Sequence, residues 1–319
     1  MSDQKPVMLS GIQPSGDLHI GNYFGAMRQQ IELAHSGKYQ SYLMVVDYHA
    51  LNTIQDADEM RRRTRELTMG YLAAGLDPSK AVLFKQSDVP AHTELCWIFD
   101  TITTMPYLMR AHAFKDAEAK NKEISVGKFN YPILMAADIL LYDTAVVPVG
   151  QDPKQHVEYA RDIAEKFNRI FKEESFVLPE AYIPPAVAVV PGTDGQKMSK
   201  SYGNVIPLFA TRDGLKERVM SIVTDSSGGL PQNVYAIHKL VRSEEELGPL
   251  YEEHKGNYKR LKELLVEDLD RYLAPLRARY EELKDHPEIV DAALESGKRE
   301  ARAVSEAKME QVRRAVGVA

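Results

Sequence analysis

Two segments far apart in the chain carry side chains that could act on a polyphosphate. The first, residues 11–22, reads Gly-Ile-Gln-Pro-Ser-Gly-Asp-Leu-His-Ile-Gly-Asn, a glycine-rich turn before a helical pattern. Such a turn lets the backbone approach a ligand, and a helix N-terminus offers free N–H groups to an anion. The second, residues 197–201, reads Lys-Met-Ser-Lys-Ser between flanking glycines. Its two lysines could neutralise charge that develops on a leaving pyrophosphate.

Either segment alone has an ordinary structural explanation. A glycine-rich turn often only connects a strand to a helix, and a lysine-rich loop is usually solvated surface. The first segment is not a Walker A loop, because no Gly-Lys-Ser or Gly-Lys-Thr follows it. The presence of both segments in one chain is what favours a nucleotide site.

A third segment, residues 131–142, has the composition of a site for an aromatic ring. On a helix, Tyr131, Met135 and Asp138 of this segment would share one face. One carboxylate among apolar neighbours suits a flat ring with a single N–H donor, which is indole. A buried carboxylate without a partner is costly, so such a site would reject phenylalanine and aliphatic side chains. A helix cap or a surface aspartate is the competing explanation.

The elements that must hold these side chains alternate between strand and helix. Apolar runs at 7–9, 42–46, 81–84 and 145–149 predict buried strands, and helical spacing of apolar residues separates them. This alternation predicts an α/β fold, a Rossmann-like doubly wound parallel sheet. The ligand crevice of such a sheet lies beyond the carboxyl ends of its strands, where all three segments fall.

A change in composition divides the chain into two expected domains. We expect a catalytic domain over residues 1–205, with a mainly helical insertion at about 90–135. After residue 206 the strand patterns cease, and residues 206–319 are expected to form an α-helical domain. Basic residues gather near its end, but glutamates are interleaved with them, so a solvated helix face is the favoured interpretation.

Charge and composition exclude several classes of protein. A net charge of -6 argues against a surface that grips nucleic acid everywhere. Cys96 is the only cysteine, which rules out an intramolecular disulfide and a cysteine-rich metal site. No run approaches the roughly 18 apolar residues of a membrane span, and the N-terminus lacks a secretory pattern. We therefore expect a cytoplasmic protein without a membrane partner.

The two phosphate segments carry a specific resemblance. His19-Ile20-Gly21-Asn22 resembles the HIGH signature of class I aminoacyl-tRNA synthetases, and residues 197–201 match their KMSKS signature letter for letter. Asn22 stands where the general signature has histidine, a form familiar in the tryptophanyl branch. Residues 131–142 closely resemble the recognition helix of that branch. The chain thus resembles the bacterial tryptophanyl-tRNA synthetase family over essentially its whole length, most strongly from residue 9 to 204.

The resemblance implies a function and its partners. L-Tryptophan would be activated with ATP and Mg²⁺ to tryptophanyl-adenylate and then passed to tRNA(Trp), which the helical domain would bind. The magnesium ion would arrive with ATP, without a metal site built by the protein. Members of this family are homodimers, so a homodimer is expected.

The resemblance also assigns residues to roles. The expected catalytic residues are His19, Asn22, Lys197 and Lys200. The expected ATP-binding residues are Gln13, Pro14, Ser15, Gly21, Asn22, Lys115, Gly150, Gln151, Asp152, Lys197, Met198, Ser199, Lys200 and Ser201. The expected tryptophan-binding residues are Leu9, His49, Tyr131, Met135, Asp138, Ile139, Val147, Val149 and Gln155. Asp138 would accept the indole N–H.

Two departures from the family pattern affect these assignments. Gln151 and Pro153 stand where most bacterial members have Glu and Gln, so the ammonium group of tryptophan must be held differently. His49 and Gln155 are the substitute candidates. Lys115 occupies a position where the family has a basic residue facing ATP, but a lone lysine is equally well explained as solvated surface.

Three alternatives remain at this point. A tyrosyl-tRNA synthetase shares the fold and both signatures, although the Met-Ala-Ala-Asp run at 135–138 argues against it. A paralogue without catalysis would have no reason to retain both lysines. A small-molecule nucleotidyltransferase of the same superfamily is disfavoured by the C-terminal helical domain.

Overall fold

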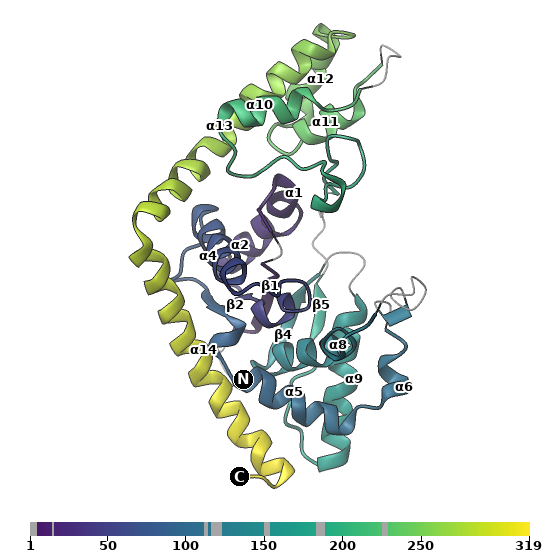
Figure 1. The fold of residues 1–319 in the computed structure, drawn as a ribbon, viewed down its shortest axis with the longest axis vertical. Helices are drawn as coiled ribbons and strands as arrows, with labels where there is room; N and C mark the ends of the chain where they lie inside the picture. Colours follow the sequence, from purple (N-terminus) through teal and green to yellow (C-terminus); the bar gives the residue numbers. More distant parts are fainter. Residues whose placement is uncertain are drawn as a thin grey trace.

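One sheet of five parallel strands organises the protein, as the computed structural model shows (Figure 1). The structure describes residues 5–14, 16–111, 114–115, 123–149, 154–182, 189–224 and 229–319. The strands are β1 (Val7–Ile12), β2 (Gln40–Val45), β3 (Val82–Lys85), β4 (Thr144–Pro148) and β5 (Glu180–Tyr182). Their order is β3-β2-β1-β4-β5, and every neighbouring pair is parallel. The predicted doubly wound α/β fold is confirmed.

Two details of the sheet differ from the sequence prediction. β1 extends beyond the apolar run at 7–9, because residues 10–12 pair in register with residues 43–45 of β2. β5 was not predicted, because its three residues Glu-Ala-Tyr contain no apolar run. It is a strand only through its parallel pairing with β4.

Alternate side chains of the strands serve two separate cores, as expected for a sheet covered on both faces. Met8 and Leu43 face a core shared with α1 (Ile20–Asn22), the π-helical turn η1 (Tyr23–Met27), α2 (Arg28–His35) and α4 (Ala57–Ala73). Leu9 and Tyr42 face a core shared with α5 (Ala91–Ile102), α8 (Val126–Leu140) and α9 (Lys154–Phe171). The two helices α5 and α8 fall largely within the expected insertion, together with the short α6 (Met105–Leu108).

Short helical turns follow the carboxyl ends of the strands. After β2 comes α3 (Asp47–Ala50), and after β3 comes the 3₁₀ turn η2 (Gln86–Asp88). A further 3₁₀ turn, η3 (Lys200–Tyr202), lies in the lysine-rich loop. These turns place polar side chains at the edge where a parallel sheet binds ligands.

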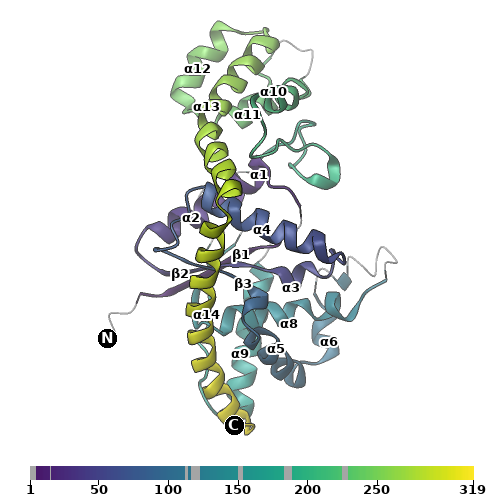
Figure 2. The ribbon, with the colours of Figure 1, turned by 60° about the vertical axis from the view of Figure 1, so that its left-hand side comes forward.

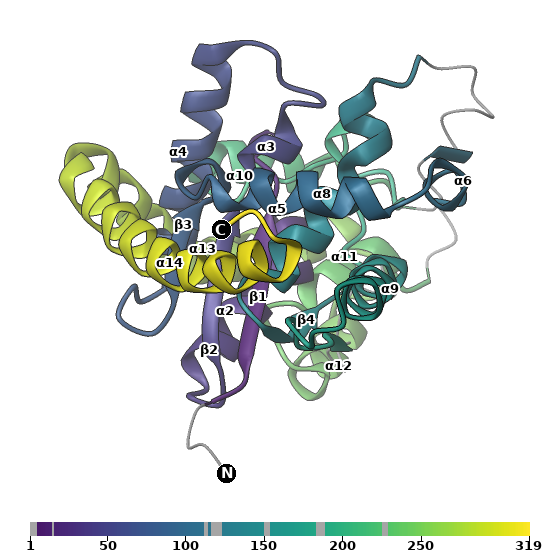
Figure 3. The same cartoon turned by 90° about the horizontal axis from the view of Figure 1, so that it is seen from below.

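The C-terminal third forms a helical bundle and then returns to the sheet. α10 (Arg212–Met220), α11 (Gln232–His238), α12 (Glu244–Glu253) and the start of α13 (Tyr258–Asp285) lie together beyond one end of the sheet (Figure 2). α14 (Pro287–Val316) runs back and packs along β3. Figure 3, viewed from below, shows its last turns approaching α5. No strand follows β5 in the part of the chain that the structure describes.

The contact between α14 and β3 requires a glycine. A Cβ on Gly297 would lie 1.9 Å from the Leu83 carbonyl oxygen, so any side chain there would force the helix off the strand. Near its C-terminus, Arg313 Nε and Nη2 each lie 2.7 Å from a carboxylate oxygen of Glu94 on α5. The last helix therefore packs against the parallel sheet and against α5.

Most basic side chains of α14 are engaged within the chain itself. Hydrogen bonds to groups of this protein are made by Lys298, Arg302, Lys308, Arg313 and Arg314. This favours an ordinary helix face over a dedicated nucleic-acid surface on α14. Within the described ranges, no helix combines the length and apolarity needed to cross a bilayer.

Candidate active site

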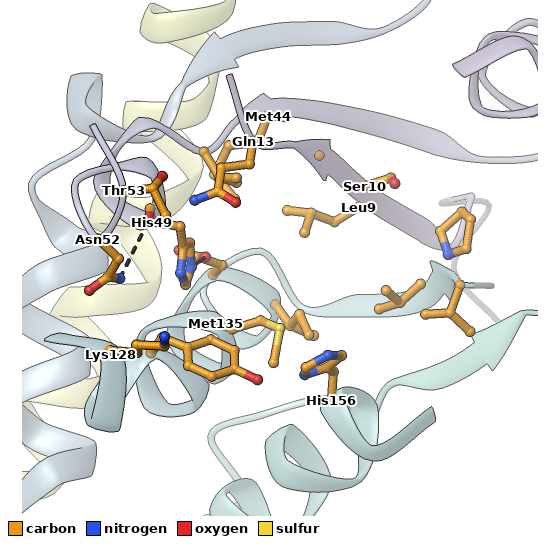
Figure 4. A pocket seen from close by; sticks show the side chains of 18 residues that line it. Leu9, Ser10, Gln13, Met44, His49, Asn52, Thr53, Lys128, Met135 and His156 are labelled. Atoms are coloured by element: carbon orange, nitrogen blue, oxygen red, sulfur yellow. Dashed lines mark hydrogen bonds and ion pairs between the residues drawn. The ribbon is translucent and has the colours of Figure 1, made fainter. Parts of the chain in front are cut away.

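A cavity of about 480 Å³ lies at the carboxyl ends of β1 and β4 (Figure 4). From this pair of strands the sheet continues to β2 and β3 on one side and to β5 on the other, which makes it the topological switch point. The cavity is lined by the expected tryptophan-binding residues Leu9, His49, Tyr131, Met135, Asp138, Ile139, Val147 and Val149. These residues come from β1, α3, α8 and β4 and the residue that follows β4, which are far apart in sequence.

Other lining residues were not expected in this role. They are Ser10, Gly11, Gln13, Met44, Val46, Asn52, Thr53, Lys128, Pro148 and His156. Gln13 was expected to bind ATP, and the structure places it in the same cavity as the predicted tryptophan site. Gln155 is not among the lining residues, whereas its neighbour His156 is. Figure 4 shows Leu9 on one side of the space and Met135 and His156 on the other.

Asp138 is the one carboxylate among the residues that line the cavity, and its side chain is 3% exposed. Its carboxylate accepts hydrogen bonds from His49 Nε2 at 2.9 Å and from Gln86 Nε2 at 2.8 Å. His92 Nδ1 lies 2.7 Å away as an ion-pair contact. Burial alone would raise the pKa of Asp138, but the contacts with His49 and His92 outweigh it and hold this pKa at about 2. The carboxylate is therefore ionised and fixed in orientation at neutral pH.

Gln86 and His92 are the residues of this network that the sequence analysis missed. Gln86 is fully buried, and its Oε1 accepts the backbone N–H of Tyr48 at 3.1 Å, which fixes the amide with its NH₂ group toward Asp138. His92 is also fully buried, and its Nε2 lies 2.9 Å from the Tyr142 hydroxyl. The position of Gln86 directly after β3, at the ligand edge of a parallel sheet, was the available signal. For His92 no comparable signal exists.

The two phosphate segments meet beside this cavity. The Ile20 N–H donates to the Ile206 carbonyl at 3.0 Å, and the Leu208 N–H donates to the Leu18 carbonyl at 2.9 Å. A Cβ on Gly21 would lie 2.9 Å from the His19 ring and 3.2 Å from Met198. Gly21 therefore allows the start of the helix and the lysine-rich loop to touch.

His19 and Lys200 form the core of the expected phosphate site. His19 is 5% exposed, and burial together with the charge of Lys200 lowers the pKa of its imidazole to about 4. Desolvation and the nearby Arg63 guanidinium lower the pKa of Lys200. At neutral pH His19 is thus a neutral hydrogen-bonding group, and Lys200 and the nearby Arg63 carry the positive charge. Lys197 is exposed at the edge of the same loop.

A buried asparagine holds the lysine-rich loop in shape. Asn204 is 2% exposed; its Oδ1 accepts the Ser199 N–H at 2.8 Å, and its Nδ2 donates to Asp194 Oδ1 at 2.7 Å and to the Lys197 carbonyl at 3.2 Å. The Met198 N–H also donates to the Val190 carbonyl at 2.9 Å. Sequence reasoning missed Asn204, since its type and neighbours do not distinguish it from other loop residues.

The remaining expected residues are placed as follows. Asn22 Oδ1 accepts the His19 N–H at 3.1 Å, and Pro14 is buried next to the described end of the first turn. The hydroxyls of Ser199 and Ser201 lie 2.9 Å apart. Lys115 is exposed, one turn after Ala111. Ser15, Gly150, Gln151, Asp152 and Pro153 lie outside the described residues.

The described residues include no cluster of side chains that could form a metal site. Among the described residues, no three His, Cys, Asp or Glu side chains gather so that they could hold an ion. The phosphate site itself is rich in cationic groups, with Lys200 and Arg63 close to Gly16.

Comparisons with known proteins identify related chains of known activity. Residues 1–284 match the family described as "tRNA synthetases class I (W and Y)". A tryptophan–tRNA ligase of Fusobacterium nucleatum is 45% identical over 318 residues, which cover 97% of each chain. Among solved structures, tryptophanyl-tRNA synthetase from Campylobacter jejuni complexed with ADP and tryptophan is 42% identical with a TM-score of 0.90, covering 97% of this chain and 99% of that one. The enzyme from Mycoplasma pneumoniae is 28% identical with a TM-score of 0.82, covering 99% of each chain.

Proposed function

Because this chain belongs to the class I tRNA synthetases of the tryptophan and tyrosine branch and is a tryptophan–tRNA ligase, we propose how its two sites divide the reaction. Tryptophan occupies the cavity between β1 and β4, and the ATP phosphates lie beside His19 and Lys200. Relatives that match nearly the whole chain are tryptophan–tRNA ligases. They argue against the three alternatives, which were a tyrosyl enzyme, a non-catalytic paralogue and a small-molecule nucleotidyltransferase.

The ionised carboxylate of Asp138 is the observation that carries the tryptophan assignment. It is the one carboxylate among the lining residues of a cavity whose other walls include Leu9, Met44, Ile139 and Val147. An indole ring buries its carbon atoms against these walls and donates its single N–H to Asp138. A substrate that lacks this N–H cannot donate a hydrogen bond to Asp138. The missing hydrogen bond makes its binding free energy less favourable.

The ammonium and carboxylate of tryptophan extend toward the polar end of the cavity. Gln13, His49 and His156 are polar residues of the cavity lining, and they are described groups that can replace the family's glutamine. Gln155 remains an expected contributor, although the cavity lining does not include it. Gln13 also connects the two sites, because it belongs to the glycine-rich segment 11–22 and lines the cavity.

Adenylation follows from positioning and from charge stabilisation. An oxygen of the tryptophan carboxylate attacks the α-phosphorus of ATP. The bond from that phosphorus to the oxygen that bridges the α- and β-phosphates breaks, and pyrophosphate leaves with that oxygen. No protein base is required, because a carboxylate is already a nucleophile. Lys197 and Lys200 stabilise the charge on the departing pyrophosphate, while His19 and Asn22 orient the phosphates. The terminal ribose hydroxyl of tRNA(Trp) then attacks the carbonyl carbon, and AMP leaves.

ATP binding also involves residues of the glycine-rich turn and of the loops around it. The residues proposed to bind ATP are Gln13, Pro14, Ser15, Gly21, Lys115, Gly150, Gln151 and Asp152. Met198, Ser199 and Ser201 complete the lysine-rich loop. The described side chains do not fit a magnesium ion held by the protein, because Lys200 and Arg63 make the site cationic. We propose that Mg²⁺ enters bound to the ATP phosphates.

The two-domain division serves the transfer step. We propose residues 1–205 as the catalytic domain and residues 206–319 as the tRNA-binding part. The bundle of α10 to α13 projects away from the sheet (Figure 2), which leaves its surface open to a long polyanion. A cytoplasmic location, where tRNA is charged, is proposed with it.

We also propose that the protein works as a homodimer. Large apolar side chains are exposed on the insertion, namely Trp97 at 70%, Met105 at 65% and Met109 at 43%. Exposed apolar groups that gather on one region mark an interface. A second copy of the chain would cover them.

Amino-acid-dependent exchange of pyrophosphate into ATP tests the proposed function. Exchange should occur with tryptophan alone among the twenty amino acids. Lys200→Ala should slow exchange on the order of 10²-fold while tryptophan affinity changes little. Exchange with tyrosine would contradict the substrate assignment, and equal losses of rate and tryptophan affinity would contradict the role of Lys200.

A further inference from the structure

Arg63, on α4, reaches the phosphate site from outside the two signature segments. A Cβ on Gly16 would lie 2.8 Å from Arg63 Nη1 and 2.9 Å from Lys200 Nζ. Arg63 Nη1 and Lys200 Nζ are therefore close neighbours, because both lie near the same point beside Gly16. Gly16 has a φ of +131°, a conformation that favours glycine, and its missing side chain leaves room for both groups.

This arrangement keeps a net repulsion that the carboxylates of the chain offset only in part, Glu59 at Arg63 and Asp17 near Lys200. Two positive charges at such a separation repel each other, and the pKa of Lys200 is lowered by desolvation and by the Arg63 guanidinium. Arg63 Nη2 pairs with Glu59 at 2.5 Å, but its Nε is buried and has no hydrogen-bond partner in the described part of the chain. Arg63 thus keeps donors that its helix neighbour does not use.

The other arginines of α4 form ion pairs with carboxylates outside the phosphate site. Arg61 pairs with Asp58, Arg62 pairs with Glu66, and Arg65 pairs with Asp291. Arg63 is the one arginine among these four whose guanidinium lies against the glycine-rich turn and Lys200. Its position is therefore a property of this site and not of a generally basic helix.

We propose that Arg63 is a third cation of the ATP site and binds the phosphates that leave as pyrophosphate, opposite Lys200. The planar guanidinium donates two parallel N–H groups, which suits a phosphate better than a single ammonium does. A polyphosphate between Arg63 and Lys200 converts their repulsion into two attractions. This inference rests on the proposed placement of the ATP phosphates at Lys200.

The test compares Arg63→Gln with Arg61→Gln, a matched loss of one arginine from the exposed face of the same helix. Pyrophosphate and ATP are the probes, in the tryptophan-dependent exchange reaction of the full chain. Arg63→Gln should raise the KM of pyrophosphate and of ATP roughly tenfold, with the KM of tryptophan and the melting temperature unchanged. Arg61→Gln should leave all four values at those of the parent protein.

Two further variants separate the possible failures. Arg63→Lys keeps the charge and should recover part of the pyrophosphate affinity. If Arg63→Gln and Arg63→Lys both lower the melting temperature and raise the KM of tryptophan as well, Arg63 is structural and the inference is overturned. If Lys200→Ala loses pyrophosphate affinity and Arg63→Gln does not, the role of Arg63 is overturned while the proposed phosphate site stands. If neither substitution changes it, the placement of the phosphates fails as well.

Discussion

The charge states of single residues set what each can do at the phosphate site. His19 stands in the signature that suggests a cationic helper, yet its imidazole is buried beside Lys200 and is neutral at physiological pH. A neutral imidazole can donate one hydrogen bond to a phosphate oxygen and accept another, without adding repulsion toward Lys200. The positive charge that faces pyrophosphate therefore comes from longer side chains that can move with it.

His19 should titrate near pH 4 in the folded protein. Its folded pKa lies below the ordinary value of 6.5, so the folded state binds fewer protons than the unfolded state between these two pH values. The contribution of His19 to stability consequently falls as the pH is lowered through that window. Proton NMR of the imidazole measures the pKa directly, and Lys200→Met should raise it part of the way toward 6.5. Titration near 6.5 in the parent protein would contradict the buried, neutral imidazole.

At the scale of the element, the lysine-rich loop is shaped by a residue outside its signature. Asn204 accepts the Ser199 N–H and donates to Asp194 and to the Lys197 carbonyl, so one buried amide holds both ends of the loop. The signature residues are proposed to carry the chemistry, and the hydrogen bonds of Asn204 fix the shape of the loop that bears them.

Replacing Asn204 should lower the rate of pyrophosphate exchange more than it weakens tryptophan binding. Asn204→Ala leaves the Ser199 N–H and the Asp194 carboxylate without their partner, and we expect a loss of about 1–3 kcal/mol in unfolding free energy. The kcat of exchange should fall roughly tenfold or more, because the lysines lose their fixed position. Asn168→Ala, which removes a capping amide at the far end of α9, is the control for general destabilisation. A similar kcat in both variants would mean that loop geometry does not limit the reaction.

Local sequence patterns predicted the strands and helices better than they predicted which side chains contact one another within the site. Four strands were visible as apolar runs, whereas β5 exists only through pairing with β4. Leu9, Met135 and Asp138 could be assigned from spacing and resemblance. Gln86 and Asn204 could not, because what makes them important is contact with residues distant in sequence, such as the 52 positions that separate Gln86 from Asp138.

At the scale of the whole molecule, the C-terminal helix joins the helical bundle to the catalytic sheet. The change in composition near residue 206 suggested a separate domain, yet Ala301, Met309 and Val312 of α14 share a core with Leu9 and Tyr42 of the sheet. The resemblance and the amino-acid pattern could not reveal this return, because it depends on tertiary contact along β3. Folding of the catalytic part should thus depend on the last thirty or so residues.

The glycine at the crossing of α14 and β3 gives the sharpest test of that dependence. Gly297→Ala introduces a Cβ that would lie 1.9 Å from the Leu83 carbonyl oxygen, and it should lower the unfolding free energy by roughly 2 kcal/mol or more. Gly248→Ala on α12, where an added Cβ meets nothing within 4 Å, should instead stabilise by about 0.5–1 kcal/mol. Denaturant unfolding of both variants measures the difference. Equal effects of the two substitutions would show that α14 does not pack tightly on the sheet.

The central claim is that Asp138 accepts a hydrogen bond from the indole N–H. A substrate analogue that lacks this N–H tests the claim most directly. The measurement is kcat/KM in pyrophosphate exchange for tryptophan and for benzothienylalanine, in which sulfur replaces the N–H group. The parent protein should prefer tryptophan by on the order of 10² or more. Asp138→Ala should bring that preference close to one, whereas Met135→Ala, which removes volume from the same cavity, should weaken both substrates and keep the preference. An undiminished preference in Asp138→Ala would contradict the account, because the N–H would then be recognised elsewhere.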